Sequence, residues 1–544
     1  SASFLDRVRD GEPIAAHNAE IERNVCESYC VPVLGWPQVP LSQWRCTAAQ
    51  AASLGLPRSL DMALKALGAP IEKAKTGTRL INLFCKPQKD GRRVFPEDAP
   101  EKWEQFLDYN FDDVIGEQWI DQRLPPLSDE EQKVYELDGL LNSRGIPVDV
   151  DLAKRAIAQV RDIDERLQLR CLELTGLKAS QRDKVLDWLQ TKGCKIETLD
   201  EQSIEGELKK DHPARVLEVL ELRLEVARAG VKKLTTMLDC VGEDGNLRGT
   251  HLYHGASTGR WSSLRVQVHN LPKGKEKDQE RTIQYVEDGI LHELTRPLSA
   301  LSKSIRGFLR ARHVFLCADY SAIEARVLAW LAGEEWLLRA FRNGEDPYCI
   351  MASAVFGRPI TKADEFERFI GKQLVLGCGY GMGPPKFIMS CAKWGVSVQL
   401  PFSKKSVYAY RDKNKKIVGY WKAIEKAACA AVTTGKSQRV GVIRFFVKDI
   451  WLFCELPSGR CLAYPYPEVH PKMTPWGEPT EELSFMGMWK NKWLRETTYG
   501  GKLVENITQA VSRDIMVTGM QNAERDGFPI VMTVHDEVIS DTPF

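Results

Sequence analysis

The chain has 544 residues, with 75 Lys and Arg against 74 Asp and Glu, a formal net charge of +1, and 43% hydrophobic residues. This length predicts several domains, and the near-zero charge argues against a uniformly basic coat protein of nucleic acid. The ordinary hydrophobic content argues against wholesale disorder. Fourteen cysteines without a Cys-x-x-Cys pair argue against a disulfide framework or a zinc ribbon and fit a reducing cytoplasm. No apolar run approaches the roughly 20 residues that span a bilayer, and we expect no signal peptide at residues 1–24.

The spacing of apolar residues predicts a mixed α/β chain, with helical insertions between pieces of one sheet. Helical periodicity is strong over residues 129–144, 150–176, 213–239 and 408–433. Three short apolar runs rich in β-branched residues predict buried strands, at Val314–Ala318, Ile443–Val447 and Ile530–Val534. Arg123–Ser128, with two adjacent prolines, predicts a linker before a helix that begins at Asp129.

Charge is distributed unevenly along the chain. Residues 97–121 contain nine acids and one base, whereas residues 403–422 contain seven bases and one acid, interleaved with three tyrosines and a tryptophan. Basic residues mixed with aromatic residues suit a polyanion whose bases can stack. A solvated helix face with its rings in the core explains such a stretch more often, so the stretch alone does not identify nucleic-acid binding.

Two acidic segments follow predicted strands. Asp319 ends the Val314–Ala318 run just before a helix, and Asp536 and Glu537 follow the Ile530–Val534 run, which predicts a hairpin with both acids at its tip. If the two strands are neighbours, Asp319 and Asp536 converge. Two carboxylates that share two Mg²⁺ ions are the arrangement used for phosphoryl transfer. Taken singly, each acid is explained as well by a helix cap or a turn.

A third segment places four side chains on one face of a helix. Arg368, Lys372, Leu376 and Tyr380 stand at steps of four residues. A guanidinium and an ammonium one turn apart match a triphosphate, because Arg forks onto terminal oxygens while Lys acts as a point charge. The segment is not a Walker A loop, since the required Gly-Lys-Ser/Thr is missing.

Together the three segments resemble motifs A, B and C of DNA polymerase family A. Asp-Tyr-Ser-x-x-Glu begins at Asp319, Arg-x3-Lys-x7-Tyr-Gly at Arg368 and His-Asp-Glu at His535, in the family's order. The resemblance covers residues 127–544 and is greatest to bacteriophage members. It implies an α/β (α+β) right-hand polymerase with palm, fingers and thumb. The expected domains are an exonuclease-like region (1–127), thumb and start of the palm (128–250), palm with motif A (251–345), fingers with the motif B helix (346–450) and palm with motif C (451–544).

The resemblance implies a template-directed, DNA-dependent DNA polymerase that adds dNTPs to a primer 3′-OH, for phage genome replication. In such an enzyme Asp319 and Asp536 hold two Mg²⁺ ions, with Mn²⁺ as a possible substitute. One ion lowers the pKa of the primer 3′-OH, and the other neutralises the leaving pyrophosphate. Catalysis is further assigned to Glu537 and to Lys372, the latter as general acid.

Other residues receive binding roles from the same resemblance. The dNTP-binding set is Arg368, Lys372, Leu376, Tyr380 and Glu324, with Glu324 as the steric gate against a ribose 2′-OH. The DNA-binding set is Arg260, His269, Asn270, Lys232, Lys233, Arg460, Gln509 and His535. The family usually has Gln in place of His269, and Phe or Tyr in place of Leu376. Because an aliphatic side chain cannot stack as a ring does, Leu376 predicts altered sugar discrimination.

The N-terminal region shows a weaker resemblance to a 3′–5′ proofreading exonuclease of the ribonuclease H-like fold. Asn18 and Glu22 resemble the second exonuclease motif, with Glu22 where the family has Asp, and Tyr109 and Asp113 resemble the third. The first motif, Asp-x-Glu on an earlier strand, does not occur before Asn18. We therefore expect a truncated exonuclease domain and no proofreading by this chain, whereas the full-length protein is expected to proofread.

Three alternatives remain at this stage, of which a stand-alone nuclease fits least, because the exonuclease set is incomplete. A single-subunit RNA polymerase shares the palm chemistry, although Glu324 argues against it. A non-catalytic DNA-binding replication factor explains the basic stretches but does not need Asp319, Asp536 and Lys372 together. The expected partners are primer-template DNA and dNTPs, for a monomer without membrane attachment in the cytoplasm, that of the bacterial host if the protein is phage-encoded. Processivity, fidelity, replisome partners, source organism and any preference for modified bases such as 2-aminoadenine stay open.

Overall fold

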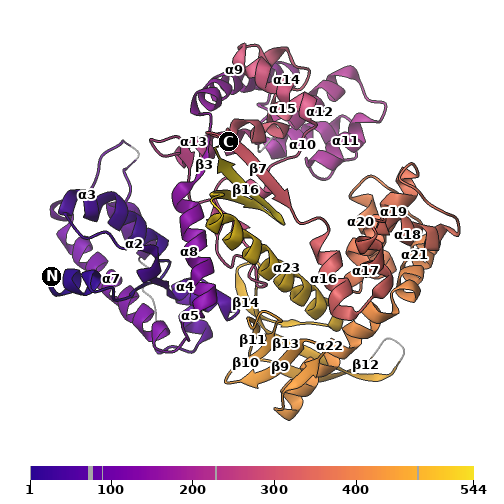
Figure 1. Ribbon diagram of the computed structural model, residues 1–544. Coiled ribbons are helices and arrows are strands. Elements are labelled where there is room, and N and C mark those ends of the chain that lie inside the picture. The colour runs from indigo at the N-terminus through magenta and orange to yellow at the C-terminus, as the bar shows by residue number, and fades with distance from the viewer. Residues whose placement is uncertain (1, 72–76, 89, 227–229, 474–476, 544) are drawn as a thin grey trace. The chain divides into compact units, whose positions relative to one another are not determined.

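The computed structural model describes residues 2–71, 77–88, 90–226, 230–473 and 477–543 (Figure 1). They form two compact units, and each unit is assembled from separate stretches of the chain. The first comprises Ser1–Gly139, Tyr253–Trp261 and Tyr320–Asn522, and the second comprises Leu140–Leu252, Ser262–Asp319 and Ala523–Phe544. Within the described ranges, no helix combines the length and apolarity needed to cross a membrane.

The second unit contains a three-stranded antiparallel sheet that carries both predicted acidic segments. Its strands are β7 (Val314–Asp319), β15 (Ile530–Val534) and β16 (Glu537–Thr542), in the order β15-β16-β7. The central strand β16 pairs with both others, so two segments more than 200 residues apart in the chain lie side by side (Figure 1). The strands predicted from the apolar runs at 314 and 530 are confirmed.

The prediction that the strand at Val314–Ala318 is buried is wrong. Val314 and Phe315 are half-buried, and the rest of β7 is exposed, whereas all but the last residue of β15 is buried. The difference follows from what covers each strand. β15 packs against the turn at Val268–Asn270 as well as against β16, whereas the principal neighbour of β7 is β16.

Helices pack on this sheet in the second unit. They are α9 (Val150–Thr175), α13 (Gly230–Asp239), α14 (Glu276–Glu287) and α15 (Pro297–Lys303). The carboxylate of Asp149 caps α9 by accepting a hydrogen bond from the Leu152 amide, and Gly176, at φ +75°, ends the helix. Leu152 and Val160 of α9 share one core with Val531 and Ile539 of the sheet. The helix predicted at 150–176 is confirmed.

A smaller helical layer follows α9 in the chain. It consists of α10 (Arg182–Thr191), α11 (Glu201–Leu208) and α12 (Ala214–Val226), around a core of its own that includes Val185, Leu189, Ile204 and Leu220. The helix predicted over 213–239 corresponds to α12 and α13, and residues 227–229 between them lie outside the described residues.

The first unit contains a helical cluster that begins directly after β7. Its members are α16 (Ile323–Ala332), α17 (Glu335–Arg342), α18 (Pro347–Phe356), α19 (Glu365–Gly377), α20 (Pro384–Ala392), α21 (Leu400–Lys413) and α22 (Lys415–Thr434). Met351, Ile370, Leu374 and Phe387 form the core between them. The single helix predicted at 408–433 is two helices. They meet at the fully buried Asn414, whose side-chain amide donates to the Tyr410 carbonyl while its oxygen accepts from the Trp336 indole.

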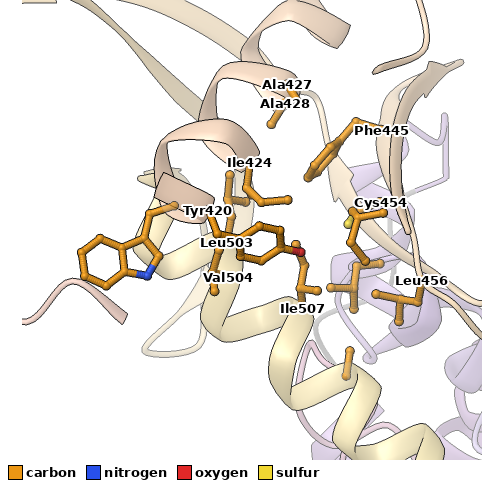
Figure 2. Close-up of a cluster of buried hydrophobic side chains, with 14 of the residues drawn as sticks. Tyr420, Ile424, Ala427, Ala428, Phe445, Cys454, Leu456, Leu503, Val504 and Ile507 are labelled. Carbon is orange, nitrogen blue, oxygen red and sulfur yellow. The ribbon is translucent and has the colours of Figure 1, made fainter. Parts of the chain in front are cut away.

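Strands and a long helix complete this part of the first unit. Strands β8 (Gln438–Val440), β9 (Ile443–Lys448), β10 (Trp451–Glu455) and β11 (Cys461–Pro465) form an antiparallel sheet, and β12 (Glu468–Met473), β13 (Pro479–Trp489) and β14 (Lys492–Thr497) form another. Figure 2 shows Tyr420 and Ile424 of α22 meeting Phe445 of β9 and Ile507 of α23 (Gly500–Arg525) in a buried cluster. The strand predicted at 443–447 is confirmed.

The N-terminal part of the first unit consists mainly of helices around two short parallel strands. The strands are β1 (Ile14–Ala16) and β2 (Trp44–Cys46). The helices are α1 (Ala2–Arg9), α2 (Glu20–Val25), α3 (Val31–Leu34), α4 (Thr47–Ser53), α5 (Leu60–Ala66), α6 (Gly77–Phe84) and α7 (Pro100–Asp121). The predicted linker at Arg123–Ser128 joins α7 to α8 (Asp129–Arg144), which confirms both it and the helix predicted from Asp129.

Candidate active site

The predicted acidic residues of the second unit lie at one end of its sheet. His535 and Asp536 form the turn between β15 and β16, with His535 in the left-handed region at φ +58°. Glu537 begins β16 and lies directly opposite Asp319, the last residue of β7. Directly opposed residues have Cβ atoms about 4.5–5.5 Å apart and point to the same face of the sheet. The two predicted acidic segments are therefore neighbours in the sheet, and Asp536 directly precedes the residue that faces Asp319.

The side chains at this sheet end can hold a divalent cation. Asp319, Asp536 and Glu537 offer only carboxylate oxygens, which are the ligands that Mg²⁺ prefers. Asp319 is exposed at the end of its strand, so solvent and a substrate can reach it. The donor set thus fits Mg²⁺, and Mn²⁺ as a substitute, rather than a metal that requires sulfur or several imidazoles.

Three histidines line the same region. The rings of His269 and His535 are 5.9 Å apart between centroids, and those of His251 and His269 are 5.6 Å apart. Burial, with a smaller effect of His535, lowers the pKa of His269 to about 4. Burial also lowers the pKa of His251 to about 3, and its Nε2 accepts a hydrogen bond from the Thr533 amide of β15. His251 and His269 are therefore neutral near pH 7. His251 was not predicted, because nothing in its sequence neighbourhood indicates contact with residue 533.

Two further predicted DNA contacts are joined by a hydrogen bond in this unit. Lys233 of α13 donates from Nζ to the backbone oxygen of Asn270, at 3.2 Å. Burial lowers the pKa of Lys233. Lys232 and Asn270 are exposed. The contact ties the start of α13 to the segment that holds His269.

In the first unit, α19 presents the predicted triphosphate ligands. Arg368 donates from Nε to the Oδ2 atom of Asp346, at 2.8 Å, and its guanidinium lies 5.4 Å from the centre of the Tyr348 ring. Asp346 also caps α18 by accepting from the Tyr348 and Cys349 amides. Lys372 and Leu376 are exposed on α19, one and two turns further along. Arg368 is thus held by its neighbours, while Lys372 and Leu376 face solvent.

Tyr380 does not continue the α-helical face as predicted. α19 ends at Gly377, and Cys378–Tyr380 form a tighter 3-10 turn. The Trp421 indole donates to the Gly379 carbonyl, at 2.7 Å, and a Cβ at Gly379 would lie 2.8 Å from Leu328. Tertiary contacts with this glycine-rich segment therefore decide where the helix ends.

The side chain of Tyr380 instead reaches Glu324 near the start of α16. Its hydroxyl donates to Glu324 Oε2, at 3.0 Å, and Arg260 donates to Glu324 Oε1, at 2.8 Å. Burial, and then the charge of Glu324, raise the pKa of Tyr380 far above its ordinary value. Three residues predicted separately thus form one hydrogen-bonded group, in which Glu324 is fixed from two sides.

Comparison with known proteins identifies the family. The model of "DNA polymerase family A" matches residues 175–444. The DNA polymerase of Bacillus phage SP02 is 37% identical over an alignment of 551 positions, which covers 97% of this chain and 83% of that protein. The chain belongs to DNA polymerase family A. The predicted family is confirmed, as is the resemblance to a phage member.

More distant family A relatives match over shorter lengths. DNA polymerase I of Helicobacter pylori is 28% identical over 283 residues, which are 51% of this chain and 28% of that protein. A solved structure of the POL domain of Pol1 from M. smegmatis, in complex with DNA primer-template and dNTP, has a TM-score of 0.59 and 18% identity. It covers 100% of this chain and 82% of that one, and at this identity the likeness shows the fold alone.

Within this family A polymerase, Arg460 is more enclosed than a DNA contact requires. Only 8% of its side chain is exposed. It pairs with Asp514, at 2.8 Å, and donates to the carbonyls of Thr258 and Ala510. This geometry favours a role in positioning the segment before Arg260. Gln509, also on α23, is half-buried, with its amide 3.4 Å from Glu505 Oε1.

The exonuclease-like residues lie on α2, two residues before it and on α7. Asn18 is exposed at φ +70°, shortly before the α2 residue Glu22, and Tyr109 and Asp113 lie on α7. Glu117, which was not predicted, interacts electrostatically with residues of both segments. Burial raises its pKa to about 7, and the charges of Glu22 and Asp113 contribute. The structure therefore brings Glu22 and Asp113 to one acidic region, although they are 91 positions apart in the chain.

Proposed function

We propose that this family A polymerase, a DNA-directed DNA polymerase, extends a primer 3′-OH by phosphoryl transfer at Asp319, Asp536 and Glu537. One observation carries the assignment of these residues: the register of β16 and β7 places Asp319 opposite Glu537, one residue from Asp536. The proposed role is phage genome replication in the cytoplasm of a bacterial host. Primer-template DNA and dNTPs are its partners, and we expect the enzyme to act as a monomer.

The carboxylates would hold two divalent ions, with Mg²⁺ the expected species and Mn²⁺ a substitute. When bound, the ions supply an activated primer hydroxyl and neutralise charge on the leaving pyrophosphate. Asp319 and Asp536 each contribute oxygens to this site, and Glu537 orients the pair from the neighbouring position on the sheet. His269 packs beside His535, which supports the hairpin turn that presents Asp536.

Arg368 and Lys372 would bind the triphosphate. Since Asp346 occupies Nε of Arg368, the guanidinium keeps its terminal nitrogens for two phosphate oxygens. Lys372 is exposed one turn away. Its ammonium can stabilise the negative charge that develops on the pyrophosphate and donate a proton to it. The ion pair with Asp346 keeps Arg368 in place before a nucleotide arrives.

Sugar selection would depend on Glu324 and Leu376. Arg260 and Tyr380 hold the Glu324 carboxylate in one orientation, so it can exclude a 2′-OH without rearranging. Leu376 has no ring and no hydroxyl with which to contact a sugar. The variant Leu376→Phe should change the incorporation of a dideoxynucleotide relative to a deoxynucleotide. Equal ratios in the variant and the wild type would contradict a role for Leu376.

Primer extension with Mg²⁺ tests the proposed active site. Asp536→Asn should lower extension by roughly 100-fold or more, because one metal ligand loses its charge. Its matched control is Asp526→Asn, an exposed acid on the loop before β15, which should extend normally. Primer-template binding, measured by fluorescence anisotropy, should persist in both variants. Normal extension by Asp536→Asn would refute the assignment of this residue, whereas DNA binding without any extension by the wild type would favour a non-catalytic replication factor.

Two variations of this assay address the remaining alternatives. Supplying ribonucleotides in place of deoxynucleotides should give little extension, and efficient extension would favour an RNA polymerase. A labelled primer with a mismatched 3′ end tests proofreading. Trimming by the wild type that disappears in Asp113→Asn would show a working exonuclease, and retention of the mismatched end by both proteins would show that this chain does not proofread.

A further inference from the structure

Three side chains with metal-binding groups meet in the small helical layer of α10, α11 and α12. Cys194 lies in the loop after α10, Glu207 lies on α11, and His212 lies just before α12. Each offers one ligand atom, and these atoms all lie within 4.8 Å of one another. In the part of the chain that the structure describes, no other group of three such side chains is as close.

The cluster is enclosed by protein. Cys194 is 4% and Glu207 3% exposed, and the side chain of His212 is 10% exposed. A buried carboxylate is costly unless it is paired. One oxygen of Glu207 lies 2.7 Å from Nε2 of His212, and the other lies 2.5 Å from Nζ of Lys210. The carboxylate is thus fixed, with an imidazole nitrogen and a thiol around the same point.

We propose that Cys194, Glu207 and His212 bind a Zn²⁺ ion. Thiolate, imidazole and carboxylate are the ligands of protein zinc sites, and three of them leave one tetrahedral position for solvent. Binding would replace the proton between His212 and Glu207 and release the proton of the Cys194 thiol. Lys210 would stay on the second oxygen of Glu207 as an outer hydrogen-bond donor.

The ligand charges match the ion. A thiolate and a carboxylate together offset the two charges of Zn²⁺. This ligand set, with sulfur and nitrogen, differs from the oxygen-only group at Asp319. The ion would connect three segments around the core of Val185, Leu189 and Ile204, where the connections are short loops and not strands. We therefore infer a structural role in holding this layer together, independent of the polymerase reaction.

Cobalt substitution tests the proposal on the full chain. Reduced, metal-free protein is titrated with Co²⁺ in excess Mg²⁺, so that Mg²⁺ occupies the hard oxygen ligands. A thiolate bound to Co²⁺ gives a charge-transfer band in the near ultraviolet, and tetrahedral coordination gives intense visible bands. We expect both bands to saturate at one equivalent and to disappear when Zn²⁺ is added. If the wild type shows no thiolate band, the proposal is overturned without any variant.

Variants then locate the ion. Cys194→Ser and His212→Gln should lose the thiolate band. Cys171→Ser, a buried cysteine of α9, and Cys317→Ser, on the strand that ends at Asp319, should keep it. A band that survives in Cys194→Ser and vanishes in Cys317→Ser would place the ion beside the acidic sheet end and overturn the proposal.

Stability gives a second measurement. Zn²⁺ should raise the thermal midpoint of the wild type, and a chelator should reverse the shift, because the ion binds the folded form. Glu207→Gln should show a much smaller shift, and circular dichroism establishes that the variant is folded. An equal Zn²⁺-induced shift in Glu207→Gln and in the wild type would show that the ion binds elsewhere.

Discussion

The ion pair of Glu131 and Arg513 offers a quantitative test of how the first unit is held together. The two guanidinium nitrogens of Arg513 donate to the two oxygens of Glu131, at 2.6 and 2.9 Å. The Tyr253 hydroxyl donates to the same carboxylate, at 2.7 Å. The side chain of Arg513 is 2% exposed and that of Glu131 is 13% exposed. Arg513 also donates to the carbonyl of Gly259, the residue before Arg260.

The lowered pKa of Glu131 gives the size of the stabilisation by this ion pair. Burial by itself would raise this pKa, but the charge and hydrogen bonds of Arg513 lower it from 4.5 to about 2. Because a tenfold change in acid dissociation corresponds to about 1.4 kcal/mol, the pairing contributes about 3 kcal/mol near neutral pH. This agrees with the roughly 3–5 kcal/mol lost when one partner of a buried pair is removed. A lowered pKa means that this stability is present above pH 4.5 and is lost as the pH falls toward 2.

Urea unfolding of the wild type and of Glu131→Gln, followed by circular dichroism, measures the effect. Glu131→Gln should lower the free energy of unfolding by about 3 kcal/mol near pH 7, and the difference should shrink as the pH falls below about 4. The matched control is Glu130→Gln, an exposed neighbour that pairs with Lys133 and should change stability by well under about 1 kcal/mol. Equal stability of Glu131→Gln and the wild type near pH 7, or a difference independent of pH, would refute the reasoning.

Three further changes test the candidate site and the N-terminal region. Lys372→Ala removes the charge that we propose binds phosphate and should raise the KM for dNTP by roughly 10-fold while lowering kcat, as measured by single-nucleotide incorporation; an unchanged KM would contradict the proposed role. Glu324→Ala removes the acceptor of Arg260 and Tyr380 and should increase the ratio of ribonucleotide to deoxynucleotide incorporation by roughly 10-fold, and an unchanged ratio would argue against a steric gate. Glu117→Gln should stabilise the protein by about 1 kcal/mol above pH 7, after allowance for partial exposure, because the charged form of an acid with a raised pKa is disfavoured by folding. That gain should decline as the pH falls through 7 and be gone below 4.5, and urea unfolding at several pH values checks it.

Local patterns were sufficient to predict the chemistry of this polymerase. Each local pattern spans about a dozen residues or fewer: an acid that follows an apolar strand, or two basic residues one helical turn apart. Over such a distance, the geometry of a strand or a helix determines which side chains are neighbours. The order of these segments predicted the family, and β-strand pairing then confirmed that the strands carrying the two acidic segments are neighbours, with Asp319 opposite Glu537.

Tertiary packing decided which of these side chains are accessible and what holds them. β7 is exposed despite its apolar sequence, Arg460 is enclosed by Asp514 and two carbonyls, and Tyr380 leaves the helical face to reach Glu324. Burial is a property of the elements that cover a residue, and a single segment does not contain that information.

The contacts that no pattern indicated are those between residues far apart in the chain. Glu131 and Arg513 are separated by 382 positions, and neither lies in a recognisable motif. Cys194, Glu207 and His212 have no spacing typical of a zinc site, because their approach depends on how α10, α11 and α12 pack. Sequence thus determined the family and the groups that we propose for catalysis, and the folded structure determined which partners orient and bury them.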